Sequence, residues 1–148
     1  MTVLNLVLAF VLSFTLPDAS KLSTIDQPTC DGTPYRDKCL KKLPQGYTFL
    51  KSYTIDGKNG TRKKKKVSYI FSKGSVYFVT LANAHPKNEG IKVTLYDSNR
   101  KRLASSYAKG KYYEAMAYRC PATGLYFLEF EFENTRNYCA GSVLAFKR

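Results

Sequence analysis

The chain has 148 residues, with 24 Lys and Arg against 11 Asp and Glu, so its formal net charge is +13. Hydrophobic residues make up 44% of it and aromatic residues 14%, which excludes a disordered tail and predicts a packed core. This length corresponds to one domain and is too short for a two-domain enzyme. The positive charge predicts attraction to polyanions or anionic surfaces.

The first twenty residues have the pattern of a signal peptide. Residues 3–16 form an almost unbroken apolar run, shorter than the about 20 residues that a bilayer-spanning helix needs. Ala19 and Ser20 are small residues that follow the run, so we expect cleavage near them and a secreted or periplasmic product. No Lys or Arg precedes the run, and the alternative is a buried strand or short helix at a true N-terminus.

Four cysteines follow this run, and an even number in an exported chain predicts disulfides. Of the three pairings, the simplest closes two short loops by joining Cys30 to Cys39 and Cys120 to Cys139. The second bond is in doubt, because in a simple meander its two residues lie near opposite ends of a sheet. The sequence has no CxxC motif, and His85 is its single histidine, so we predict no metal site, no catalytic thiol and no cofactor.

The remainder divides into a short lead segment and a β domain. Residues 21–46 contain several Pro and Gly without a sustained period, so we expect an irregular segment held by a disulfide. From Tyr47 onward, apolar and polar residues alternate between turn clusters at the spacing typical of sandwiches and barrels. Strands are predicted at 47–55, 67–71, 76–81, 91–95, 103–107, 112–120, 125–133 and 138–146. Residues 47–148 therefore predict an all-β fold, a two-sheet antiparallel β-sandwich that is jelly-roll-like and has about eight strands.

Two stretches resemble a known family. Residues 91–106 read IKVTLYDSNRKRLASS and residues 123–128 read TGLYFL. They resemble the Tyr-Asp turn and the Thr-Gly-Thr-Tyr-Tyr strand start of bacterial pre-peptidase C-terminal domains, and the resemblance covers roughly residues 75–146. Those domains are exported jelly-roll-like sandwiches, usually appended to secreted hydrolases, and some bind polysaccharide or collagen. The resemblance implies the fold and a non-catalytic role. Those domains generally lack cysteines, and we expect this chain to be free-standing instead of appended to a hydrolase.

The densest group of positive charge is our candidate binding site, and it comprises Arg62, Lys63, Lys64, Lys65 and Lys66. Such a run binds a phosphate or sulfate polymer in a salt-sensitive way, or an anionic membrane surface at about 1 kcal/mol per basic residue. The alternative is a solvated hairpin tip that keeps the protein soluble and protects a strand edge.

A row of carboxylates marks one predicted strand. Glu129, Glu131 and Glu133 alternate with apolar residues, so they share one face. Glycoside hydrolysis needs two carboxyl groups across a cleft, and calcium sites usually draw ligands from loops as well. We therefore expect cross-strand pairing of this row with basic neighbours. Tyrosines offer a weaker signal for sugar stacking, at Tyr107, Tyr112, Tyr113 and Tyr118.

These observations predict a small, exported, non-catalytic β-sandwich stapled by disulfides. It would bind an anionic polymer, a glycan or a membrane surface, or act as an accessory subunit of an envelope assembly, and no nucleic-acid partner is expected. One alternative is a polymer hydrolase that uses carboxylates among Glu114, Glu129 and Glu131. Another is an intracellular nucleic-acid binder, which requires that the N-terminal run is not a signal.

Overall fold

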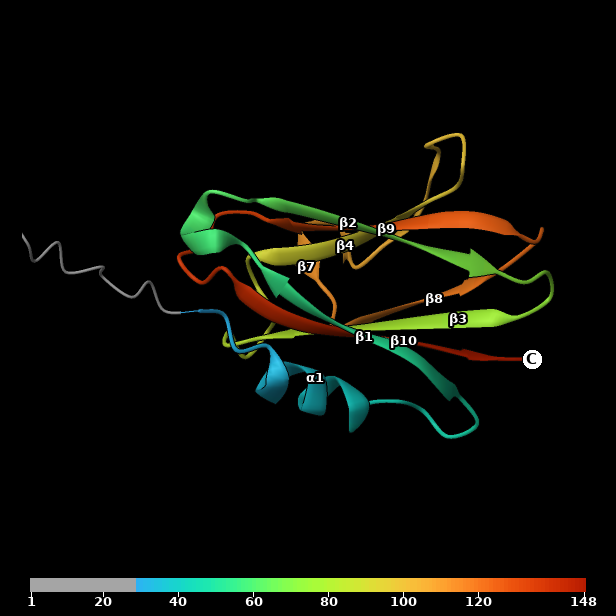
Figure 1. Ribbon diagram of the computed structural model, residues 1–148, viewed down its shortest axis with the longest axis horizontal. Coiled ribbons are helices and arrows are strands. Elements are labelled where there is room, and N and C mark those ends of the chain that lie inside the picture. Colours follow the sequence, from blue (N-terminus) through green and yellow to red (C-terminus); the bar gives the residue numbers. More distant parts are fainter. Residues whose placement is uncertain (1–28) are drawn as a thin grey trace, which may run out of the picture.

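The computed structural model describes residues 29–148, so the predicted signal peptide lies outside the described residues. One α-helix and one short 3-10 helix accompany ten strands (Figure 1). In chain order the elements are α1 (Thr33–Leu40), β1 (Thr48–Asp56), η1 (Lys58–Gly60), β2 (Lys64–Phe71), β3 (Val76–Asn83), β4 (Ile91–Tyr96), β5 (Arg102–Ser105), β6 (Tyr107–Ala108), β7 (Lys111–Tyr112), β8 (Ala115–Arg119), β9 (Gly124–Phe132) and β10 (Cys139–Lys147).

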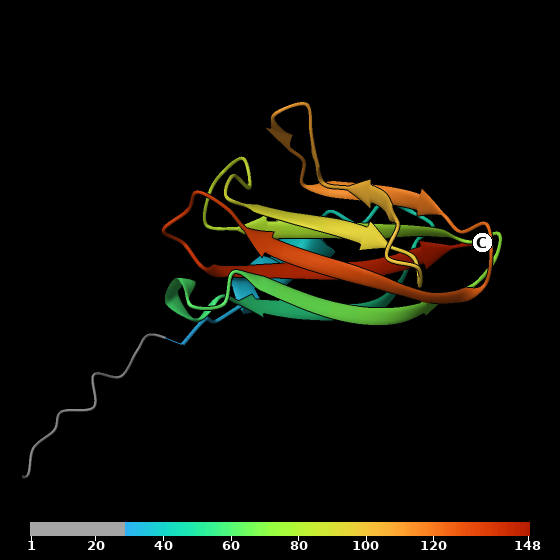
Figure 2. The same ribbon diagram turned by 90° about the horizontal axis from the view of Figure 1, so that it is seen from above.

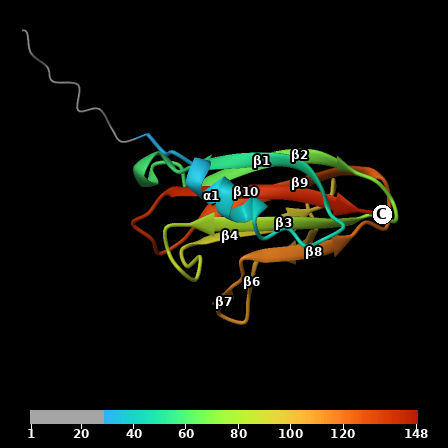
Figure 3. The ribbon, with the colours of Figure 1, turned by 90° about the horizontal axis from the view of Figure 1, so that it is seen from below.

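Eight strands form two four-stranded antiparallel sheets that pack face to face (Figures 1 and 2). Sheet A has the order β1-β10-β3-β8, and sheet B has the order β2-β9-β4-β5. The pairs β1–β10, β2–β9, β3–β8 and β4–β5 are nested like the two arms of one long hairpin that has been folded across the sandwich. This nesting is the jelly-roll arrangement, so the predicted fold class is confirmed. The remaining strands, β6 and β7, form a small hairpin at the side (Figure 3).

Alternation along the strands builds the core between the sheets. On β9, Tyr126, Leu128, Phe130 and Phe132 are buried, whereas the residues between them face outward. Near one end of the core, the ring of Phe71 stacks on that of Tyr126, with centroids 4.9 Å apart. The prediction that Glu129 and Glu131 lie on the opposite face of this strand from its buried apolar residues is therefore confirmed.

The lead segment is helical where an irregular loop was expected. Helix α1 lies across the outer face of sheet A, over β10 and β3 (Figure 3). The first backbone nitrogen of the helix, that of Thr33, donates a hydrogen bond of 3.0 Å to the Asp31 carboxylate. The apolar residues of the helix follow no stripe, which is why the sequence gives little helical signal. The helix forms because it packs on sheet A, where Cys39 is fully buried against Ala82 and Val143. A Cβ added at Gly141 would lie 2.5 Å from the backbone nitrogen of Arg36, so only glycine permits this approach.

The disulfide pairing also differs from the simplest expectation. Cys30 is bonded to Cys139, with their Cα atoms 5.3 Å apart, while Cys39 and Cys120 are buried thiols. The expected pairs Cys30–Cys39 and Cys120–Cys139 are therefore wrong. The physical reason is that the lead segment runs across sheet A instead of closing on itself, so its first cysteine meets the start of β10.

Three predicted strands differ from the structure by more than one or two residues at an end. Strand β2 begins at Lys64, three residues earlier than expected, so most of the basic run is strand instead of loop. The two predicted strands at 103–107 and 112–120 are each divided. The reason is topological, because between β5 and β8 the chain crosses from sheet B to sheet A through the β6–β7 hairpin.

Candidate functional site

The outer face of sheet B, which no helix covers within residues 29–148, has a charged half. Lys64 Nζ lies 3.0 Å from Glu131 Oε1, and Lys92 Nζ lies 3.2 Å from Glu131 Oε2. Lys66 Nζ lies 3.4 Å from Glu129 Oε2. These contacts join three neighbouring strands, and they confirm the expected cross-strand pairing of the carboxylate row.

This ladder is electrostatically satisfied. Partial burial raises the pKa of Glu131, but hydrogen bonds from Lys64 and Lys92 outweigh it and hold that pKa below its usual value. The hydrogen bond to Glu131 in turn raises the pKa of Lys64. For Lys92, burial lowers the pKa, and its bonds to Glu133 and Glu131 more than compensate. These charges neutralise one another, so they form an ion-pair network and not a free anion site.

The predicted binding run is dispersed by the fold. Lys64 and Lys66 pair with the carboxylate row, and Lys65 Nζ donates a hydrogen bond of 2.6 Å to the carbonyl oxygen of Thr54 on β1. Arg62 and Lys63 lie in the exposed turn before β2. The structure therefore does not bring the five residues together on one surface, and their role in binding stays a prediction.

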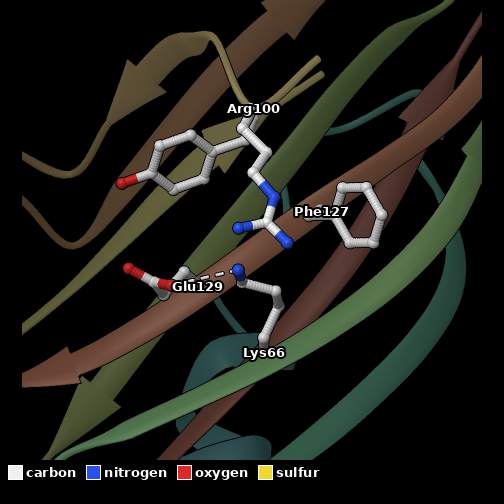
Figure 4. A pocket seen from close by; sticks show the side chains of 5 residues that line it. Lys66, Arg100, Phe127 and Glu129 are labelled. Atoms are coloured by element: carbon white, nitrogen blue, oxygen red, sulfur yellow. Dashed lines mark ion pairs between the residues drawn. The ribbon is translucent and has the colours of Figure 1, made fainter. Parts of the chain in front are cut away.

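A cleft of about 230 Å³ lies in the other half of this face (Figure 4). Its lining comes from three strands and one turn: Lys66, Tyr96, Arg100, Phe127 and Glu129. Figure 4 shows the Arg100 guanidinium reaching over the sheet toward Lys66 and the ring of Phe127, with Glu129 on the far side of the lysine. Two cationic groups thus converge beside an aromatic surface.

The turn between β4 and β5 presents Arg100. The Asp97 carboxylate accepts hydrogen bonds from the backbone nitrogens of Asn99 and Lys101, at 2.9 and 2.8 Å. Arg100 itself has φ +64°, in the left-handed region that glycine and asparagine normally occupy.

Arg100 can recognise an anion. Within residues 29–148, its guanidinium takes part in none of the ion pairs, which occupy six of the carboxylates in that range. A guanidinium binds carboxylate, sulfate or phosphate groups through two parallel hydrogen bonds. The half-buried rings of Tyr96 and Phe127 offer an apolar floor beside it. Sequence reasoning missed all three residues, because Arg100 is one of three consecutive basic residues in the sequence.

The other predicted residues lie elsewhere. Glu114 pairs with Lys42 and lines a second cleft, of about 560 Å³, beside the β6–β7 hairpin. Glu129 lines the first cleft, so these two do not form the opposed carboxylate pair that hydrolysis needs. Of the four tyrosines, Tyr107 and Tyr112 are together, with ring centroids 4.7 Å apart.

Neither a metal cluster nor a membrane helix is found in the part of the chain that the structure describes. Residues 29–148 hold no group of three or more His, Cys, Asp or Glu side chains placed to share a metal ion. No helix within the same range has the length and apolar character that crossing a bilayer requires.

Comparison with known proteins leaves the function open. No protein-family model matches the sequence, and no curated protein matches it. Among solved structures, Aeromonas hydrophila PliG, a periplasmic lysozyme inhibitor of g-type lysozyme, is similar over 72% of this chain and 90% of that chain. The identity is 12% and the TM-score is 0.42, so no functional argument is drawn from this similarity.

Proposed function

We propose that this protein is a non-catalytic binding protein for an acidic saccharide, which it holds in the Arg100 cleft on the outer face of sheet B. The observation that carries the proposal is the Arg100 guanidinium, which has no ion-pair partner within residues 29–148 and lies in the cleft beside the ring of Phe127. Arg100 supplies the bidentate contact to a carboxylate or sulfate group. The Lys66 ammonium is paired with Glu129, so within residues 29–148 Arg100 is the cation lining this cleft that has no ion-pair partner.

The aromatic floor favours a saccharide over a bare inorganic anion. Phe127 and Tyr96 face one another across β9 and β4, so their rings border the same cleft. Aromatic side chains carry a large apolar surface, and that surface suits the C–H face of a pyranose ring. An acidic sugar places such a face next to its charged group, which matches the two parts of the cleft.

The rest of the molecule is consistent with a binding protein outside the reducing cytosol. Cys30 and Cys139 form a disulfide, and disulfides persist in oxidising compartments. The described part of the chain carries a formal charge of +14, because residues 1–28 contain Asp18, Asp26 and Lys21. Such a charge steers anionic ligands toward the protein at low salt.

Titration calorimetry with oligogalacturonate as an acidic saccharide and dextran fragments as a neutral one tests the proposal. We expect binding of the acidic saccharide only, with affinity that falls as salt rises. Arg100→Gly should weaken this binding by about tenfold or more, the loss expected for a hydrogen bond to a charged group. It should not lower stability, because glycine accepts the left-handed backbone at position 100 without strain.

Two matched variants identify the site. Lys109→Gly removes another cation from a left-handed position, φ +50°, outside the cleft, so it should leave binding nearly unchanged. Arg62→Gly removes a cation from the basic run. If Arg62→Gly weakens binding more than Arg100→Gly does, the ligand binds the basic run and the proposed cleft is wrong.

A further inference from the structure

Two exposed aliphatic side chains adjoin the Arg100 cleft. Ile70 is 64% exposed and Leu125 is 43% exposed, and they lie directly opposite one another on β2 and β9. Leu125 is two residues before Phe127 on the same face of β9, a separation of about 7 Å along the strand. The cationic cleft and the aliphatic pair therefore form one continuous strip of surface.

The solvent-exposed position of Ile70 and Leu125 does not require apolar side chains there. The charged half of the same face shows that alternate outward positions on β2 and β9 can hold paired lysines and glutamates. Ile70 and Leu125 stand at the equivalent positions farther along the same two strands, yet both are large and apolar. Contiguous exposed apolar surface beside polar groups is typical of interaction sites.

The charge around the pair favours an anionic partner. The turns β2–β3, β4–β5 and β8–β9 and the end of β10 all lie at this end of the sandwich, next to the C-terminus (Figure 1). The turns β2–β3 and β4–β5 carry three cationic side chains, Lys73, Arg100 and Lys101, whereas Lys147 lies over the Tyr47 ring on the outer face of sheet A. Asp97 is the one acidic side chain in these segments, and its carboxylate is bound within its own turn.

We propose that the natural ligand is an acidic glycolipid and that this strip docks the protein on the membrane that displays it. This inference rests on the proposed function, because the acidic sugar occupies the Arg100 cleft. It adds that the hydrocarbon next to the sugar packs on Ile70 and Leu125. The surrounding cations lie over the anionic membrane surface, where each basic residue contributes about 1 kcal/mol.

Vesicle binding separates this inference from the proposed function. The full mature protein is sedimented with phosphatidylcholine vesicles that contain sulfatide, phosphatidylglycerol or neither, and each variant is also titrated with oligogalacturonate. The informative variant is Ile70→Thr/Leu125→Thr, since both side chains are exposed and threonine suits a strand. Leu40→Thr, which changes an exposed aliphatic residue on α1, is the matched control.

We expect strong binding to sulfatide vesicles, which the double variant weakens by about tenfold or more, with unchanged oligogalacturonate binding. Arg100→Gly should weaken both, and Leu40→Thr neither. If the double variant binds sulfatide vesicles like the wild type, the glycolipid inference is overturned while the saccharide cleft stands. Equal binding to phosphatidylglycerol vesicles would also overturn it, because charge alone would then suffice. If neither oligogalacturonate nor sulfatide vesicles bind, both proposals fail.

Discussion

The two sheets of the sandwich differ most on their outer faces. Sheet A is covered, because α1 lies on it and Tyr47 packs against Phe78 at a ring distance of 5.1 Å. Sheet B is open to solvent within the described part of the chain, and its outer face carries both an ion-pair ladder and a cleft. The same jelly-roll frame thus has one structural face and one face available for a ligand.

The residue types on the two faces follow this division. Under α1 the sheet presents small side chains, such as Gly141, Ala82 and Val143, which let the helix backbone approach closely. The open half of sheet B presents long or aromatic side chains instead, among them Arg100 and Phe127. Function is therefore expected on the face where large side chains remain without a structural partner.

The largest expected effect on stability comes from removing the disulfide that holds α1 on sheet A. Replacing both cysteines, as Cys30→Ser/Cys139→Ser, should lower the free energy of unfolding by about 2–5 kcal/mol, because the bond closes a loop of more than a hundred residues. Urea unfolding of this variant and the wild type measures the loss. Hydrogen exchange should show that the amides of α1 lose protection first, since the helix begins at Thr33 and the bond from Cys30 to Cys139 ties that end of it to β10.

The same cysteine variant should keep its affinity for the saccharide. The outer face of sheet B lies on the opposite side of the sandwich from the disulfide-held helix, so the cysteine variant should bind oligogalacturonate with unchanged affinity while it remains folded. A parallel loss of binding at temperatures where the variant is still folded would contradict the division into a structural face and a ligand face.

A smaller effect is expected from filling the space beneath the helix. Gly141→Ala adds a Cβ 2.5 Å from the Arg36 nitrogen, so α1 must shift, at a cost of about 1–3 kcal/mol. Gly124→Ala is the matched control, because nothing lies within 4 Å of its new Cβ. Thermal unfolding of both variants checks the comparison. Equal melting temperatures would mean that α1 is not seated closely on sheet A.

The sequence predicts those elements that depend on neighbouring residues, and it misses those that depend on contacts between distant parts of the chain. The strand β9 was readable because each of its residues alternates between core and solvent, a local signal. Helix α1 was not readable, since eight residues without an apolar stripe become helical through contact with Val143 and Ala82, far away in the chain. The prediction of the disulfide pairing failed for the same reason, because Cys30 and Cys139 are 109 positions apart and only the folded sandwich brings them together.

The candidate site shows the same limit. The run Arg62–Lys66 is conspicuous in the sequence, yet two of its lysines are bound by carboxylates that lie more than sixty positions later. Arg100 is inconspicuous beside Lys101 and Arg102, and only the turn geometry separates it from them. The density of charge in the sequence therefore shows where the basic residues are. It does not show which of them are free to bind a ligand.

The smallest expected effect on stability comes from removing one charge of the ion-pair ladder on the outer face of sheet B. Glu131 has a pKa below its ordinary value of 4.5, so its ion pairs stabilise the fold above that pH and are lost as the pH falls through the folded-state value. Glu131→Gln should therefore cost about 0.5–1 kcal/mol at neutral pH, typical of a partly exposed ion pair, and progressively less as the pH falls below 4.5.

Urea unfolding of the wild type and Glu131→Gln across this pH range gives the difference that isolates Glu131. The comparison is needed because Asp56, whose pKa is also lowered, chiefly by a hydrogen bond from the Lys58 backbone, contributes to the acid slope of both proteins. High salt should shrink the difference, since it screens partly exposed pairs. A difference that stays constant with pH would mean that the charge of Glu131 is not what stabilises the ladder. The charged half of the face would then hold the three strands together through packing alone, and its lysines would be as free to meet an anion as Arg100 is.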